Sequence, residues 1–105
     1  MRFIETPVFT RSIVALLDDE AYRLLQLALF HRPERGAVIR GSGGLRKVRW
    51  PLPGHGKRGG LRVIYFWDEA SETAYMLFAY PKNEREDLTA QQLRVLSRLV
   101  REEFG

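Results

Sequence analysis

The chain has 105 residues, 45% of them hydrophobic and 11% aromatic, and it contains no cysteine. We expect one small domain over residues 1–105, because this length suits a single core and the composition is too apolar for disorder. The absence of cysteine excludes disulfides and thiolate metal sites. No apolar run reaches the roughly 18 residues of a membrane span, and the N-terminal residues lack the apolar core of a signal peptide. We therefore expect a cytoplasmic protein with no membrane partner.

The net charge of +4 is unevenly distributed along the chain. Between Arg35 and Trp67 the sequence has eight basic residues and no acidic one, so the rest of the chain is net negative. A basic block interleaved with glycines and aromatic residues is typical of proteins that bind polyanions. Nucleic acid is therefore the expected partner class. A membrane-surface helix fits less well, because the block lies in strand-like sequence broken by Gly and Pro.

The first third of the chain predicts one strand and two helices. The strand covers Arg2–Thr6, and a short helix covers Phe9–Leu17. Asp18 and Asp19 supply an N-cap and negative first-turn charge for a second helix, which ends before Pro33. The predicted buried stripe of this helix, spaced three and four residues apart, comprises Ala21, Leu24, Leu25, Ala28 and Leu29.

The remainder predicts three strands and a final helix. Residues 36–44 are rich in glycine and leave little room for regular structure. The strands cover Leu45–Leu52, Leu61–Trp67 and Thr73–Tyr80, and the last two are expected to form a hairpin. A capping box over Thr89–Gln92 begins a helix that ends at about residue 103. Its predicted core stripe comprises Leu93, Leu96 and Val100, widened by Val95 and Leu99.

This order of elements predicts an α+β fold. We expect a small, mainly antiparallel sheet packed by two N-terminal helices and a C-terminal helix, with the helices covering one face. Alternation in the third strand puts Arg62, Ile64 and Phe66 on one face of the sheet, opposite the residues between them.

Two arginines are expected to meet on this sheet. If the second and third strands pair, Arg49 and Arg62 come close on one surface. Like charges side by side destabilise a sheet, and a phosphate partner would compensate for the repulsion. The alternative interpretation is a basic strand that is simply solvated.

Other chemistry fits the sequence less well. The two histidines, His31 and His55, are too few for a histidine-based metal site. The glycine-rich segments lack the residue types and the following helix that a phosphate-binding loop needs. We therefore expect neither a metal nor a cofactor.

Three segments in this order resemble the RelE/ParE superfamily of toxin–antitoxin toxins, and most closely its HigB-like branch. They are Gly43–Trp50, Gly60–Tyr65 and Tyr80–Glu84. The resemblance implies a RelE-like fold and ribosome-dependent cleavage of mRNA in the A site, by the RNA's own 2′-OH and without metal. It also implies inhibition by a cognate antitoxin, usually a helix-turn-helix protein of the HigA type, and an isolated toxin that is monomeric.

The resemblance also implies roles for individual residues. Catalytic roles fall to Lys57, Arg62 and Lys82: Arg62 matches the strand arginine that grips the scissile phosphate, and Lys57 is a candidate for proton transfer. The expected RNA-binding residues are Arg46, Lys47, Arg49, Arg58, Tyr80 and Arg85. The sequence departs from some family members in having no aromatic residue between Tyr80 and Phe104.

Two other functions remain open at this stage. A ParE-like protein would share the fold but inhibit DNA gyrase by protein contact, without RNA-cleaving cations. A basic module that binds RNA or DNA without chemistry would carry the same block of positive charge. Catalysis would depend on one or two positions, whereas binding alone would tolerate single losses and exchange of Lys for Arg.

Overall fold

The computed structural model describes residues 1–52, 60–84 and 87–104. Three helices and five strands follow one another in this part of the chain. They are β1 (Arg2–Glu5), α1 (Pro7–Leu16), α2 (Asp19–His31), β2 (Ala37–Val38), β3 (Leu45–Trp50), β4 (Leu61–Asp68), β5 (Thr73–Pro81) and α3 (Ala90–Phe104).

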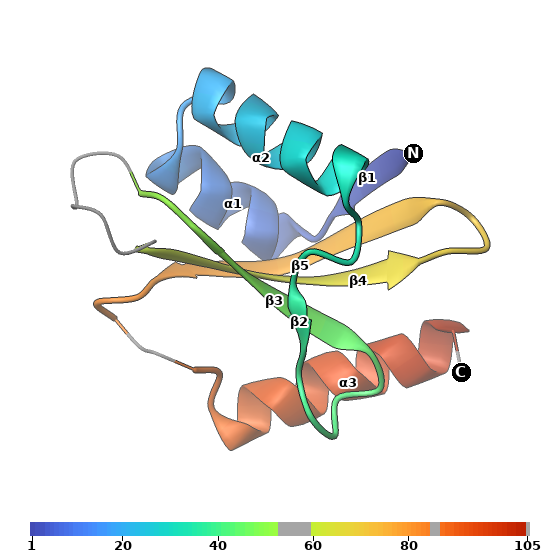
Figure 1. Ribbon diagram of the computed structural model, residues 1–105. Coiled ribbons are helices and arrows are strands. Elements are labelled where there is room, and N and C mark those ends of the chain that lie inside the picture. The colour runs from blue at the N-terminus through green and yellow to red at the C-terminus, as the bar shows by residue number, and fades with distance from the viewer. Residues whose placement is uncertain (53–59, 85–86, 105) are drawn as a thin grey trace.

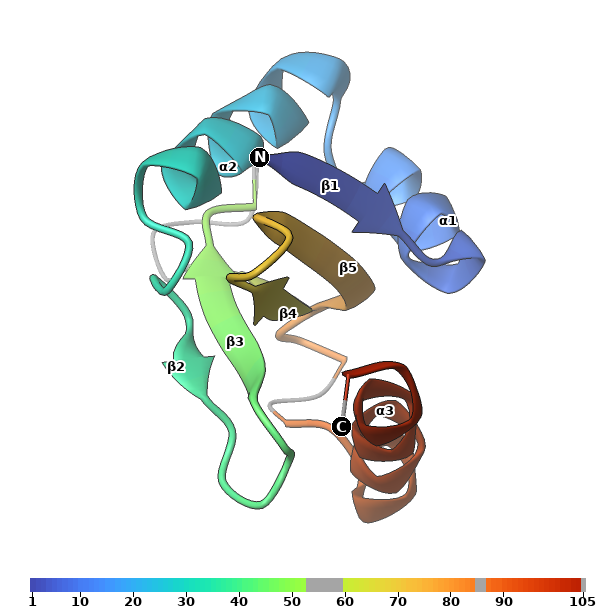
Figure 2. The same cartoon turned by 90° about the vertical axis from the view of Figure 1, so that its right-hand side faces the viewer.

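The strands form one sheet in the order β1-β5-β4-β3-β2. Strands β2 to β5 pair antiparallel with their neighbours, whereas β1 lies parallel to β5 at the edge. Helices α1 and α2 cover one face of the sheet and α3 covers the other (Figures 1 and 2). The predicted α+β class is confirmed, but the expectation that all helices cover one face is wrong. Apolar residues point to both faces of β4 and β5, so both faces need a cover.

Strand β2 lies where the sequence predicted no regular structure. Ala37 pairs with Lys47, and Val38 pairs with Arg46 at the edge of the sheet. Both β2 side chains are exposed. A two-residue strand with no buried side chain has no apolar alternation by which the sequence could reveal it.

A β-bulge in β5 links the sheet to the first helix. Ile64 pairs with Phe78 and Tyr65 with Met76, which leaves Leu77 as the extra residue between them. The carbonyl of Leu77 accepts a hydrogen bond of 2.9 Å from Oγ1 of Thr6. Oγ1 of Thr6 also caps α1 by accepting the N–H of Phe9 at 3.0 Å. One threonine therefore fixes the start of α1 against the bulge.

The predicted helical stripes are only partly buried. In α2, Leu25 and Leu29 are fully buried against the sheet, but Leu24 is exposed, contrary to the prediction. The stripe is therefore narrower than its spacing suggested. None of the described helices is both long and apolar enough to cross a bilayer.

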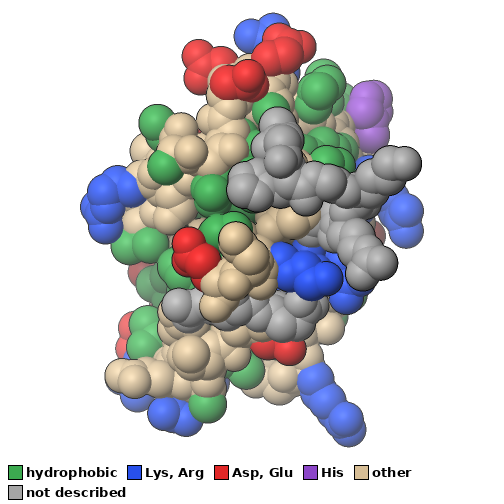
Figure 3. Space-filling model, turned by 90° about the vertical axis from the view of Figure 1, so that its left-hand side faces the viewer, with side chains coloured by type: hydrophobic (Ala, Val, Ile, Leu, Met, Phe, Trp, Pro, Cys, Tyr) green, Lys and Arg blue, Asp and Glu red, His purple; other side chains and the backbone are tan. Residues whose placement is uncertain are grey.

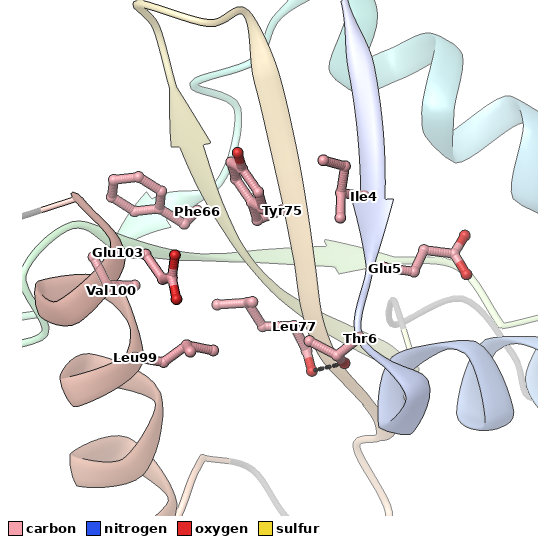
Figure 4. A pocket seen from close by; sticks show the side chains of 9 residues that line it. All are labelled: Ile4, Glu5, Thr6, Phe66, Tyr75, Leu77, Leu99, Val100 and Glu103. Atoms are coloured by element: carbon pink, nitrogen blue, oxygen red, sulfur yellow. Dashed lines mark hydrogen bonds between the residues drawn. The ribbon is translucent and has the colours of Figure 1, made fainter.

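On α3, Val100 is buried, whereas Val95 and Leu99 are exposed, again contrary to the prediction. Leu99 faces Leu77 and Ile4 across a hollow of about 380 Å³, which lies between α3 and the β1–β5 edge (Figure 4). Helix α3 thus leaves this edge of its sheet face uncovered.

The carboxylate of Glu5 joins β1 to both N-terminal helices. It accepts hydrogen bonds of 2.6 Å from the hydroxyl of Thr10 on α1 and from the hydroxyl of Tyr22 on α2. Burial, and then the nearby Glu5 carboxylate, raise the pKa of Tyr22 well above its usual value of 10.0. The folded protein therefore holds this proton more tightly than the unfolded chain does.

Replacement of Tyr22 by Phe tests this contact. At pH 7 we expect the free energy of unfolding to fall by roughly 1–2 kcal/mol, because a hydrogen bond to a charged group is lost. The raised pKa contributes stability below about pH 10, which is lost as the pH rises and the unfolded tyrosine ionises. Urea unfolding at increasing pH should therefore show a shallower alkaline loss for Tyr22→Phe than for the wild type. Equal slopes would contradict this assignment.

Candidate nucleic-acid interface

The alternation of strand β3 divides the basic block between the two faces of the sheet. In the pairing with β4, Arg46 lies opposite Tyr65, whereas Lys47 lies opposite Ile64 and Arg49 lies opposite Arg62. Partners in an antiparallel pair project to the same face. Because Tyr65 packs in the cluster under α1 and α2, Arg46 belongs to that side. Lys47 and Arg49 belong to the α3 side, with Ile64.

Arg46 holds the connection between α2 and β2 in place through hydrogen bonds. Its Nη1 donates to the carbonyls of Glu34 and Gly36, at 3.1 and 2.8 Å, and its Nη2 lies 3.4 Å from the Glu34 carboxylate. The hydroxyl of Tyr65 reaches the same connection, donating to the carbonyl of Pro33 and accepting the N–H of Gly36. The structure therefore does not bring Arg46 together with the other predicted RNA-binding residues of β3.

Arg35, the first residue of the basic block, also lies away from the α3 side. Its guanidinium stands 5.7 Å from the ring centre of Trp50, which packs against the cluster under α1 and α2. A cation over an aromatic face is attracted by the ring, so this contact accounts for Arg35 structurally.

Of the cations on strands β3 and β4, three lie together on the α3 side: Lys47, Arg49 and Arg62. We call them the cationic cluster. Arg49 and Arg62 are direct partners across β3 and β4, and Lys47 lies two residues before Arg49 on the same face. The predicted approach of Arg49 to Arg62 is thus confirmed by the strand register. On the side of the molecule that carries this end of the sheet, Lys and Arg side chains gather next to acidic ones (Figure 3).

Arg62 is the most unusual member of the cationic cluster. Its side chain is only 1% exposed, although a guanidinium is always charged. Its Nη1 lies 3.4 Å from the carbonyl of Leu61, a long hydrogen bond. Burying a cation, and placing a second cation directly opposite it, both cost free energy.

Asp87 supplies an anion to the cationic cluster. Its Oδ1 lies 2.5 Å from Nζ of Lys47. The hydrogen bond and charge of Lys47, followed by the charges of Arg62 and Arg49, lower the pKa of Asp87. The carboxylate therefore stands in the combined field of all three cations. The sequence did not indicate this pairing, because Asp87 is 40 residues from Lys47 and reaches it only through the fold.

The other predicted site residues lie in different settings. Lys82 is exposed just after β5, and its backbone N–H donates to the carbonyl of Gly60 at 2.6 Å. Tyr80 is opposite Arg62 in the sheet, but its ring is only 2% exposed and packs 5.6 Å from that of Phe78. This burial leaves no ring face for a base, so Tyr80 is a packing residue here. The predicted residues Lys57, Arg58 and Arg85 lie outside the described residues.

The cationic cluster suits an anionic ligand that approaches from the end of the sheet. Arginine offers planar paired donors to phosphate, and lysine a compact charge. Such groups position a phosphate and stabilise negative charge that develops on it. In the part of the chain that the structure describes, His, Asp and Glu side chains form no group of three that would hold a metal ion.

Known structures share this architecture. The chain is similar to a double arginine-to-alanine mutant of the E. coli toxin RelE in the free state, with 12% identity, a TM-score of 0.58, and coverage of 93% of this chain and 94% of that one. It is also similar to a chain of the intact E. coli RelBE toxin–antitoxin complex, with 13% identity, a TM-score of 0.55, and coverage of 76% and 94%. These likenesses define a RelE-like α+β fold.

The family follows from a match in sequence. Residues 23–104, well over half of the chain, match the profile of the RelE toxin of the RelE / RelB toxin-antitoxin system. The chain therefore belongs to the RelE toxin family.

Arg46 and Arg49, three residues apart on β3, provide a matched test of the two faces. We expect Arg46→Ala to lower the free energy of unfolding by about 1–3 kcal/mol, because the carbonyls of Glu34 and Gly36 lose their charged donor. Arg49→Ala should change it by no more than about 0.5 kcal/mol, since Arg49 is exposed. Urea unfolding of both variants measures the difference, and equal effects would contradict the assignment of faces.

Proposed function

We propose that this protein is a toxin that cleaves mRNA on the ribosome, as a metal-independent endoribonuclease, and so inhibits translation. The observation that carries the proposal is the burial of Arg62 directly opposite Arg49 in the sheet. Such an arrangement costs stability and is expected where the cations serve a ligand. Membership of the RelE toxin family supports an RNA phosphate as that ligand.

In the proposed reaction the RNA attacks itself. The 2′-oxygen forms a bond to the adjacent phosphorus, the bond from phosphorus to the 5′-oxygen breaks, and a 2′,3′-cyclic phosphate and a 5′-hydroxyl result. The 2′-OH loses a proton and the leaving 5′-oxygen gains one. Arg49, which is exposed, would hold the scissile phosphate, and the buried charge of Arg62 directly opposite would help to stabilise the extra negative charge on its oxygens during attack.

The remaining roles follow the family resemblance. Lys47 would bind a phosphate beside Arg49, and Lys82, exposed at the same end of the sheet, would contribute positive charge or a proton. Lys57 remains the candidate for proton transfer, and Arg58 and Arg85 remain candidates for phosphate binding.

We further propose that a cognate antitoxin, of the helix-turn-helix HigA type, inhibits the protein, and that the isolated toxin is monomeric. The likeness to a chain of the intact E. coli RelBE toxin–antitoxin complex supports an antitoxin partner. A HigB-like specialisation within the family remains part of this proposal.

Inducible expression in a bacterial host, with mapping of mRNA 5′ ends, tests the reaction. We expect growth arrest and new 5′ ends inside translated codons, with the same message left intact when its start codon is removed. Lys47→Ala and Arg49→Ala should each lower cleavage by about 10²-fold, because each removes a donor to the phosphate. Arg23→Ala removes an exposed cation from α2 and should change nothing. Growth arrest with intact mRNA would instead favour a ParE-like target, and RNA binding without cleavage a binding module.

Arg62→Met separates function from folding at the buried position. Methionine retains much of the packing and removes the buried charge. We expect the variant to remain folded, with a cooperative urea unfolding transition, and to leave mRNA intact. A variant that is stable and fully toxic would contradict the role given to Arg62.

A further inference from the structure

The two partners of the Lys47–Asp87 ion pair differ in exposure. The Lys47 side chain is 21% exposed, whereas that of Asp87 is 70% exposed. The mostly covered Lys47 side chain is therefore paired with an anion that is itself mostly exposed to solvent. A hollow of about 130 Å³ lies beside the pair and is lined by both residues. A ligand in solution can thus approach Lys47 from the side that Asp87 occupies.

The backbone holds Asp87 at this position. Leu88, the next residue, packs with the apolar cluster under α3. Thr89 then begins α3 with a reciprocal capping box: its hydroxyl accepts the N–H of Gln92 at 3.1 Å, and its N–H donates to the Gln92 side chain at 3.0 Å. An apolar anchor and a helix cap therefore follow Asp87 directly and set its carboxylate over the sheet.

The carboxylate of Asp87 lies in positively charged surroundings. Lys47, Arg62 and Arg49 all favour its charged form. An anion at this point reduces the repulsion within the cationic cluster. A phosphate of bound RNA would do the same, with more oxygens and more charge.

We propose that Asp87 is a built-in competitor for RNA: its carboxylate occupies, at Lys47, the place of a substrate phosphate, which displaces it on binding. This inference rests on the proposed function, because it takes the ligand of the cationic cluster to be RNA. The exchange costs little, since an ion pair with an exposed carboxylate is weakened by water and salt. The side chain of Asp87 can turn into solvent while its backbone stays in place.

The Asp87 carboxylate also reduces electrostatic repulsion in the toxin that has no RNA bound. Lys47, Arg49 and Arg62 repel one another when no ligand is bound, and Asp87 offsets that repulsion. Because RNA must displace Asp87, it binds less tightly than it would to the cationic cluster without this carboxylate. Bound RNA then dissociates more readily, which favours release of the cleaved product.

Binding of a labelled short single-stranded RNA to the purified full chain, measured by fluorescence anisotropy over a series of salt concentrations, tests the proposal. We expect Asp87→Asn to bind about three- to tenfold more tightly than the wild type, because the competing charge is gone. The slope of log Kd against log salt should steepen by about 0.7, since Lys47 then contributes a full phosphate contact. Glu84→Gln is the matched control: it removes the same charge from an exposed residue of the same loop. It should give a smaller gain and an unchanged slope.

The double variant Lys47→Ala/Asp87→Asn shows whether Asp87 acts through Lys47, because the gain from Asp87→Asn should disappear in it. Equal binding by Asp87→Asn and Glu84→Gln, including no binding by either, overturns the proposal. Weaker binding by Asp87→Asn also overturns it, because Asp87 would then position Lys47 rather than compete with RNA. If Lys47→Ala binds RNA as the wild type does, the cationic cluster is not an RNA site, and the proposed function itself fails. Urea unfolding of each variant confirms that it is folded.

Discussion

Strand β4 is covered on both faces, and the rest of the structure depends on this constraint. Its residues from Leu61 to Tyr65 are almost completely buried, although their side chains alternate between the two faces. Leu61, Val63 and Tyr65 pack under α1 and α2, whereas Ile64 packs under α3. Any residue placed between them is buried as well. Arg62 is therefore buried because of the strand in which it stands, and its charge must be stabilised by what lies around it.

The same alternation places Arg46 and Arg49 of β3 on opposite faces of the sheet. Arg46 turns toward Tyr65 and holds the connection from α2 to β2 through backbone carbonyls. Arg49 turns toward Arg62 on the other face. Positive charge that is continuous in sequence is therefore divided in space between the two faces of the sheet.

The cationic cluster is assembled from parts of the chain that meet only in the folded sheet. β3 supplies Lys47 and Arg49, β4 supplies Arg62, and the segment before α3 supplies the opposing charge of Asp87. The apolar clusters on both faces of the sheet hold these segments in place.

The sequence alone determined the elements whose signals are local. The signals for the caps at Asp18 and Thr89 and for the alternation of β4 each span only a few residues, so short-range patterns reveal them. Tertiary structure decided the rest: the parallel edge strand β1, the bulge at Leu77, the cover on both faces, and the pairing of Lys47 with Asp87. These features depend on contacts between residues far apart in the chain. Their free energy comes from packing and charge in three dimensions, and no short-range pattern carries it.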